Sequence, residues 1–100
     1  MPSLENLIDL RERIDRVDAS LIVLLAERFS LTEKVGLIKA QSGLSAEDSG
    51  RERWQQERYE DLATSHHLDV ETALQVMKTI VGLVKNRHAA IATPAEPRQP

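Results

Sequence analysis

The sequence contains no cysteine, and this absence excludes disulfide bonds, thiolate metal sites and cysteine nucleophiles. Basic residues are too few to favour a nucleic-acid or acidic-membrane partner, because 13 Lys and Arg stand against 16 Asp and Glu, a net charge of −3. The amino end carries acids before its first base and has no apolar run. We therefore expect no secretory signal and a cytoplasmic protein.

Proline is also scarce, and its placement predicts the fold class. It occurs only at positions 2, 94, 97 and 100, so positions 3–93 lack the strongest helix breaker. The sequence predicts an all-α protein with one helical domain over residues 1–92. The proline-rich end, residues 93–100, has almost nothing to bury, and we expect a disordered tail there.

A seven-residue repeat of apolar positions predicts one very long first helix, from Ser3 to about Gln41. Nine of the ten seam positions are apolar, which is typical of a helix packed along its whole length in coiled-coil fashion. The two seams are Leu7, Ile14, Leu21, Arg28, Val35 and Leu10, Val17, Leu24, Leu31, Ile38.

Two shorter helices are predicted after it, at about Asp48–Ser65 and Val70–Ala92. Their starts are indicated by capping residues, Ser45 or Asp48 for the second helix and Asp69 for the third. A first helix about 57 Å long is roughly twice the breadth of a compact domain of this size, and these two helices cannot cover it. We therefore expect an intertwined antiparallel helical dimer.

Arg28 occupies a seam position that the repeat otherwise gives to apolar residues. Its helical neighbours three and four positions away carry no acid that would neutralise it. A desolvated guanidinium without a partner costs several kcal/mol, so something anionic must meet it. The candidates are a bound anion or an acid from another helix, unless the side chain snorkels to solvent.

Two further basic residues lie near the same face of the first helix. Lys39 is eleven positions after Arg28, about 20° round the helix axis, although a lysine there also suits a solvated helix C-terminus. Arg11 would lie about 25 Å from Arg28 along a straight helix, so only an antiparallel partner could bring it to the same ligand. The structural alternative for Arg11 is a surface ion pair with Asp15.

The later helices offer two acids and one histidine. Asp48 and Glu52 stand four apart and share one face at the start of the second helix, where a helix cap and a solvated charge run are the plainer interpretations. His88 interrupts the apolar stripe of the third helix. It is either a core histidine bonded to a carbonyl or a residue that contacts a ligand. His66 and His67 lack i,i+4 spacing, and we expect no metal site.

In this order and at these spacings, the segments resemble the all-helical chorismate mutases from Leu7 to Ile91. The segments are Leu10-Arg11-Glu-Arg-Ile-Asp15, Leu24-Leu-Ala-Glu-Arg28, Val35-Gly-Leu-Ile-Lys39-Ala, Asp48-Ser-Gly-Arg51-Glu52-Arg53 and His66-His-Leu-Asp69. The resemblance implies a homodimer of three-helix subunits that rearranges chorismate to prephenate in phenylalanine and tyrosine biosynthesis, with no cofactor and no metal.

The same resemblance implies a role for each site residue. Arg28, together with Arg11 of the partner subunit, would bind the two carboxylates of the substrate. Lys39 would reach the ether oxygen and a carboxylate. Asp48 and Glu52 would hold the ring hydroxyl.

Two positions depart from the pattern of the best-known bacterial members. Val84 replaces a serine that helps to bind a carboxylate, which removes one hydrogen bond. His88 replaces a glutamine that faces the ether oxygen; an imidazole can still donate there and would make activity depend on pH. The expected catalytic residues are therefore Lys39, His88 and Arg28, acting by orientation and charge stabilisation.

Two other functions remain open from the sequence. An isochorismate–pyruvate lyase uses the same scaffold, and Arg11, Arg28 and Lys39 do not discriminate it from a mutase. A catalytically silent helical dimerisation module is the other alternative, in which Arg28 pairs with an acid and binds no substrate.

Overall fold

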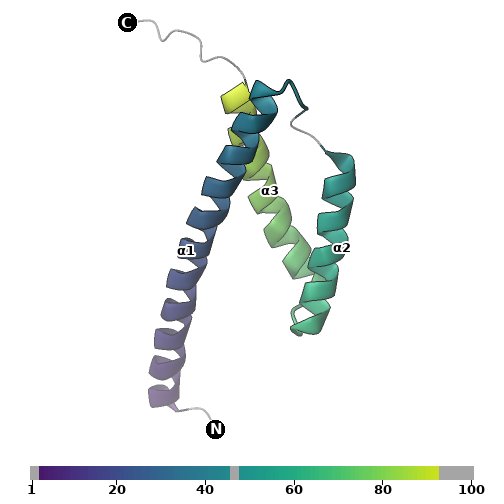
Figure 1. The fold of residues 1–100 in the computed structure, drawn as a ribbon. Coiled ribbons are helices and arrows are strands. Elements are labelled where there is room, and N and C mark those ends of the chain that lie inside the picture. Colours follow the sequence, from purple (N-terminus) through teal and green to yellow (C-terminus); the bar gives the residue numbers. More distant parts are fainter. Residues whose placement is uncertain (1–2, 46–47, 93–100) are drawn as a thin grey trace, which may run out of the picture. The chain divides into compact units, whose positions relative to one another are not determined.

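The computed structural model describes residues 3–45 and 48–92, with side chains as far as residue 90 at the carboxyl end. Within these ranges it contains three α-helices, α1 (Leu4–Gln41), α2 (Ser49–Ser65) and α3 (Val70–Ala92) (Figure 1). The all-helical prediction is confirmed for the described residues, and the predicted helix boundaries hold to within a residue. The predicted tail over 93–100 lies outside the described residues.

All three helices begin at a side-chain cap, which explains why their starts were predictable. Each cap accepts a hydrogen bond from the backbone N–H three residues later, a donor that the helix itself leaves unpaired. Of the two candidates for the start of α2, the cap is Asp48 and not Ser45. The bonds join Asn6 N to Ser3 Oγ at 3.2 Å, Arg51 N to Asp48 Oδ1 at 3.0 Å, and Thr72 N to Asp69 Oδ2 at 3.0 Å.

Helices α1 and α2 end in the same backbone motif, with a left-handed residue just after the helix. That residue is Gly43 after α1 (φ 67°) and His67 after α2 (φ 56°). The N–H of the following residue reaches back to a carbonyl of the last turn, from Leu44 to Lys39 at 2.8 Å and from Leu68 to Ala63 at 2.9 Å. This is the Schellman arrangement, which glycine favours because it lacks a Cβ.

The chain divides into two compact units, Met1–Leu31 and Thr32–Pro100, with the division inside α1. The described part of the first unit is the amino-terminal portion of α1. Its apolar seam is open, because every seam leucine, isoleucine and valine from Leu7 to Leu31 is between 40% and 59% exposed. A row of apolar side chains this long is the kind of surface that a second helix covers.

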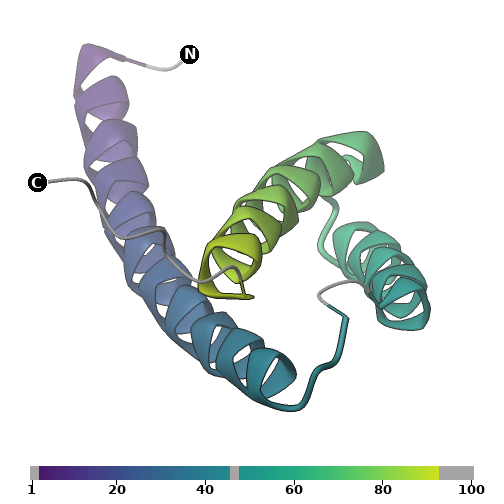
Figure 2. The same ribbon diagram turned by 90° about the horizontal axis from the view of Figure 1, so that it is seen from above.

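In the second unit, α2 and α3 run antiparallel, side by side, and are joined by a short turn (Figures 1 and 2). The last turns of α1 are tied to α3 by an ion pair between Glu33 and Arg87. Few described residues are buried, and their side chains are mostly small. They are Gly36, Ala63, Ala73, Val84 and His88.

No described helix combines the length and the apolar character that crossing a membrane requires.

Candidate functional site

His88 is the buried polar side chain of α3, with 8% of its surface exposed. Its Nε2 lies 2.7 Å from the backbone carbonyl oxygen of Thr32 in α1, so this nitrogen carries the proton and donates. Beneath the ring lies Gly36, where a Cβ atom would come within 2.7 Å of the imidazole Cδ2. A glycine at this position therefore lets the histidine approach α1 closely.

Val84 lies one turn before His88 and is also buried, at 7% exposure. The apolar stripe of α3 is thus buried at Val84 and at His88, the two positions that depart from the pattern of the best-known bacterial chorismate mutases. Val84 brings no polar group, whereas His88 is held by a carbonyl. Among the described residues, His88 is bonded to a backbone carbonyl, as expected for a core histidine. Its contact with a ligand stays a prediction.

Arg28 belongs to the first unit and is partly buried. One terminal nitrogen of its guanidinium, Nη1, is buried without a hydrogen-bond partner among the described residues. One reason that Nη1 is unpaired is that no acid stands three or four positions from Arg28 in the helix. A buried N–H of a cation is a strong donor that an anionic oxygen would satisfy.

Arg11 is exposed on the same helix, nearer its amino end. The ion pairs of this stretch join Arg13 to Asp9 at 3.9 Å and Arg16 to Glu12 at 4.0 Å. The surface pair between Arg11 and Asp15 that the sequence offered as an alternative is not formed among the described side chains. Arg11 is therefore accessible to a ligand or to a partner subunit.

Lys39 belongs to the second unit, where it lies half-buried in the last turn of α1. A cation here is favoured by the helix dipole, because the last carbonyl groups carry partial negative charge. The structure thus gives Lys39 a place that suits its structural interpretation, and its role toward a substrate stays a prediction.

Asp48 is exposed and caps α2 through Arg51 N–H, as its structural interpretation expected. The Arg51 side chain is turned over the ring of Trp54, with its guanidinium carbon 4.8 Å from the ring centroid. This cation–π contact lies on the exposed surface of α2 and has a modest energy. One oxygen of Asp48 is used by the cap, and the other remains to accept a bond from a ligand.

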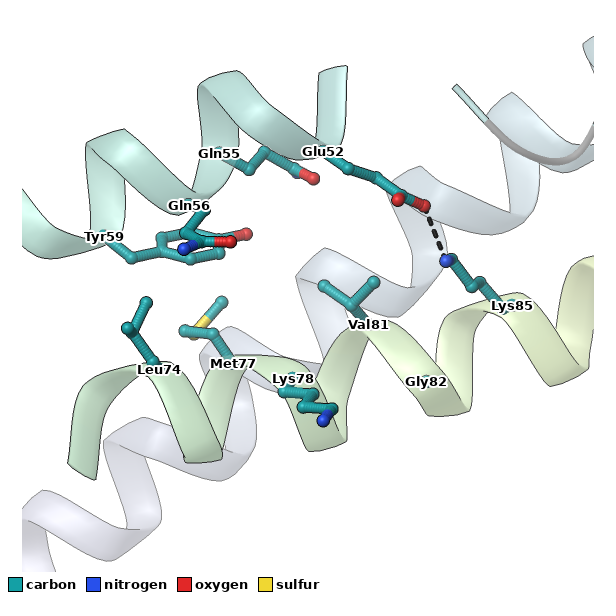
Figure 3. Close-up of a pocket in the computed structure, with 10 residues that line it drawn as sticks. All are labelled: Glu52, Gln55, Gln56, Tyr59, Leu74, Met77, Lys78, Val81, Gly82 and Lys85. Carbon is teal, nitrogen blue, oxygen red and sulfur yellow. Dashed lines mark ion pairs between the residues drawn. The ribbon is translucent and has the colours of Figure 1, made fainter. Parts of the chain in front are cut away.

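Glu52 lies one turn further along α2 and forms an ion pair across to α3. Its Oε1 is 2.6 Å from Nζ of Lys85. Both side chains line a pocket of about 490 Å³ between the two helices, shown in Figure 3. Its floor carries apolar side chains, among them Leu74, Met77 and Val81, and its wall on α2 is polar.

Three residues of this region were missed from the sequence: Lys85, Thr32 and Gly36. Lys85 follows Val84 directly, and nothing in the local sequence links it to an acid on another helix. Thr32 acts through its backbone carbonyl, which no side-chain pattern reveals. Gly36 was visible as a glycine inside a strong helix pattern, which signals a close approach when the helix does not end there.

The described residues contain no group of three side chains placed to bind a metal ion. The predicted site residues are divided between the two units: Arg11 and Arg28 lie in the first, and Lys39, Asp48, Glu52 and His88 lie in the second.

Comparison with known proteins assigns most of the chain to a family. Residues 10–89 match the family model described as chorismate mutase type II. The chain is 31% identical over 78 residues to a chorismate mutase of Methanocaldococcus jannaschii, covering 78% of this chain and 79% of that protein. It is 38% identical over 81 residues to bifunctional chorismate mutase/prephenate dehydratases of Escherichia coli K12 and Shigella flexneri, covering 81% of this chain and 21% of theirs. The resemblance identified from the sequence is confirmed: this chain belongs to the chorismate mutase type II family.

Proposed function

We propose that this protein converts chorismate to prephenate, and that it serves the biosynthesis of phenylalanine and tyrosine. The observation that carries the proposal is the family match over residues 10–89, since all six predicted substrate-binding residues fall inside it. The relatives named chorismate mutase support the same reaction. The bifunctional relatives are about five times as long as the matched region, so the proposal concerns the mutase reaction alone.

The reaction is an intramolecular [3,3] rearrangement, in which the ether C–O bond breaks while a new C–C bond forms. It needs no nucleophile, metal or cofactor. The enzyme must hold the enolpyruvyl arm over the ring in a chair-like geometry and stabilise the negative charge that grows on the ether oxygen. Cations fixed around a dianionic substrate meet both needs.

We assign the carboxylates of the substrate to Arg28 and to Arg11 of the partner subunit. The unpaired Nη1 of Arg28 supports this assignment, because a carboxylate oxygen would give that buried donor its missing acceptor. Lys39 is assigned to the ether oxygen and a carboxylate, and the acids at the start of α2, Asp48 and Glu52, to the ring hydroxyl.

His88 is assigned to the ether oxygen beside Lys39, and its bond to Thr32 sets a condition on that role. While Nε2 donates to the carbonyl, Nδ1 of a neutral ring has only a lone pair and cannot donate. The ring therefore serves the ether oxygen either as imidazolium, through Nδ1, or after releasing Thr32. In both cases the rate of chorismate turnover should differ between the parent protein and a His88→Gln variant, whose amide donates without either step.

The proposed assembly is an intertwined dimer that buries the open seam of α1. Its support is the exposure of the seam in the first unit, from Leu7 at 40% to Leu24 at 59%. Sedimentation at micromolar concentration should give twice the 11.2 kDa mass of the chain. A folded species of 11.2 kDa would contradict the assembly and, with it, the assignment of Arg11 to the other subunit's site.

The activity is tested by incubating the purified protein with chorismate and, separately, with isochorismate, and by identifying the products. We expect prephenate from chorismate without added metal. Release of pyruvate from isochorismate as the main reaction would indicate the lyase instead. Lack of turnover of both substrates would indicate the silent dimerisation module.

Arg28→Ala provides the matching test of the site. It should abolish most turnover while the protein stays folded, because the buried Nη1 of Arg28 has no hydrogen-bond partner among the described residues that its removal would leave unpaired. Arg13→Ala, which removes only a surface pair with Asp9, is the control and should leave turnover unchanged. Preserved activity in Arg28→Ala together with lost stability would show that the arginine is structural.

A further inference from the structure

The ion pair between Glu52 and Lys85 joins a predicted substrate-binding acid to a lysine that has no assigned role. The two groups reach toward each other from α2 and α3 at one end of the pocket (Figure 3). Their side chains are 41% and 39% exposed, so a ligand can still reach the carboxylate. Resting on the proposed function, we infer that Lys85 is a specificity-determining residue that compensates the charge of Glu52 and so admits a dianionic substrate.

The need for compensation follows from the charges of the two partners. A substrate with two carboxylates is repelled by a bare carboxylate in its binding site, and the repulsion grows as water is displaced. With Nζ of Lys85 at 2.6 Å from Oε1, the pair presents no net charge to the incoming dianion. Glu52 then contributes a hydrogen-bond acceptor without its electrostatic cost.

The geometry leaves that acceptor available. The ion pair uses Oε1 of Glu52, and a carboxylate has two oxygens with about four lone-pair directions. Oε2 is thus able to accept a bond from a hydroxyl group while the lysine holds the other oxygen. Lys85 also restricts the rotamers of Glu52, which has three side-chain torsions to fix.

Fold stability gives a weaker reason for this pair. Ion pairs between partly exposed side chains contribute little to the free energy of unfolding, since solvent screens them and both long side chains lose freedom. Loss of the pair should therefore leave the thermal midpoint nearly unchanged. An effect on substrate binding without an effect on stability separates the inferred role from a structural one.

The test compares Lys85→Met with two variants in steady-state kinetics on chorismate. Lys85→Met should raise KM about tenfold, the scale of one uncompensated charge at a solvent-accessible site, and change kcat less than about twofold. Lys85→Arg keeps the charge and should restore KM to within about threefold. Lys78→Met, which removes a lysine of the same pocket that forms no ion pair among the described residues, should leave KM unchanged.

The link to Glu52 is tested in the Glu52→Gln background, where no carboxylate needs compensation. There Lys85→Met should change KM by less than about twofold. An equal rise in both backgrounds would show that Lys85 acts on the substrate by itself, and an unchanged KM in Lys85→Met alone would show that it has no role; either result overturns the inference. Turnover by the unaltered protein separates these failures from failure of the proposed function, which would show as no turnover at all.

Discussion

The imidazole of His88 rests directly against the backbone of Gly36, and no larger residue fits between them. A Cβ at position 36 would lie 2.7 Å from Cδ2, 3.1 Å from Nε2 and 3.3 Å from Cγ of the ring. This contact and the bond to Thr32 fix the ring against the last turns of α1. The position of a predicted catalytic group thus depends on the absence of a side chain on another helix.

Gly36→Ala is expected to displace the His88 ring and to weaken its bond to Thr32. The added methyl group overpacks the contact, so the protein should lose about 1–3 kcal/mol of unfolding free energy in chemical denaturation, despite the better helix propensity of alanine. Gly50→Ala is the control, because its Cβ would meet Asp48 Oδ1 at an ordinary 3.6 Å. Equal stability of the two variants would contradict the close contact.

His88→Gln is expected to retain much of the turnover and to remove its dependence on pH. An amide donates regardless of protonation, whereas an imidazole has a second donor only when it is protonated. His88→Ala should lower kcat on the order of 10²-fold, the usual loss for one donor to a developing oxyanion. The measurement is kcat as a function of pH; parent-like activity of His88→Ala at every pH would make His88 purely a core residue.

Asp69 gives a pH-dependent contribution to stability whose sign follows from its hydrogen bonds. The hydroxyl of Thr72, and then its backbone N–H, hold the pKa of Asp69 below its usual value of 3.8. Because the folded-state pKa is the lower one, the stabilisation is present above the unfolded-state pKa and is lost as pH falls through the folded-state pKa.

Thr72→Val isolates the side-chain part of this effect. It removes the hydroxyl that lies 2.8 Å from Asp69 Oδ2, so we expect the pKa of Asp69, followed by NMR titration, to rise toward its usual value. Thr79→Val removes a hydroxyl bonded to the Gln75 carbonyl, 3.0 Å away, and should leave that titration unchanged. A titration of Asp69 that is the same in all three proteins would contradict the assignment.

His67→Gly is expected to stabilise the protein by about 0.5–1 kcal/mol. An L-residue in the left-handed region costs about 1–2 kcal/mol, which exceeds the roughly 0.5–1 kcal/mol that glycine loses in chain entropy. His66→Gly is the matched control, since His66 has φ −105° and gains nothing from glycine there. Denaturation curves should therefore move in opposite directions for the two neighbours.

Most of the fold was predictable because its signals are local. The helix starts are indicated by Ser3, Asp48 and Asp69, each of which accepts a hydrogen bond from the backbone N–H three positions later. Gly43, in the left-handed conformation, follows the end of α1. The end of α2 carried no such signal, because a histidine adopts the left-handed conformation that a sequence pattern assigns to glycine. Local sequence signals thus predict where a helix starts or ends, because they act over one or two helical turns.

The contacts of the candidate site were not predictable for the opposite reason. The bond between His88 and Thr32 spans 56 positions, and the partner of Glu52 lies on a different helix. A heptad pattern gives the face of each helix but not its rotation and offset against its neighbour. For Arg28, the sequence could show the lack of a local acid, and the structure adds the buried, unpaired nitrogen.

The shortage of buried side chains has a thermodynamic consequence. Among the described residues five are buried, and of these only Val84 is a branched aliphatic. In the proposed dimer, the α1 seam adds a hydrophobic contribution to folding that is available only when two chains meet. Such a dimer couples folding to association, so its midpoint of thermal unfolding should rise with protein concentration, and dilution should favour the unfolded chain.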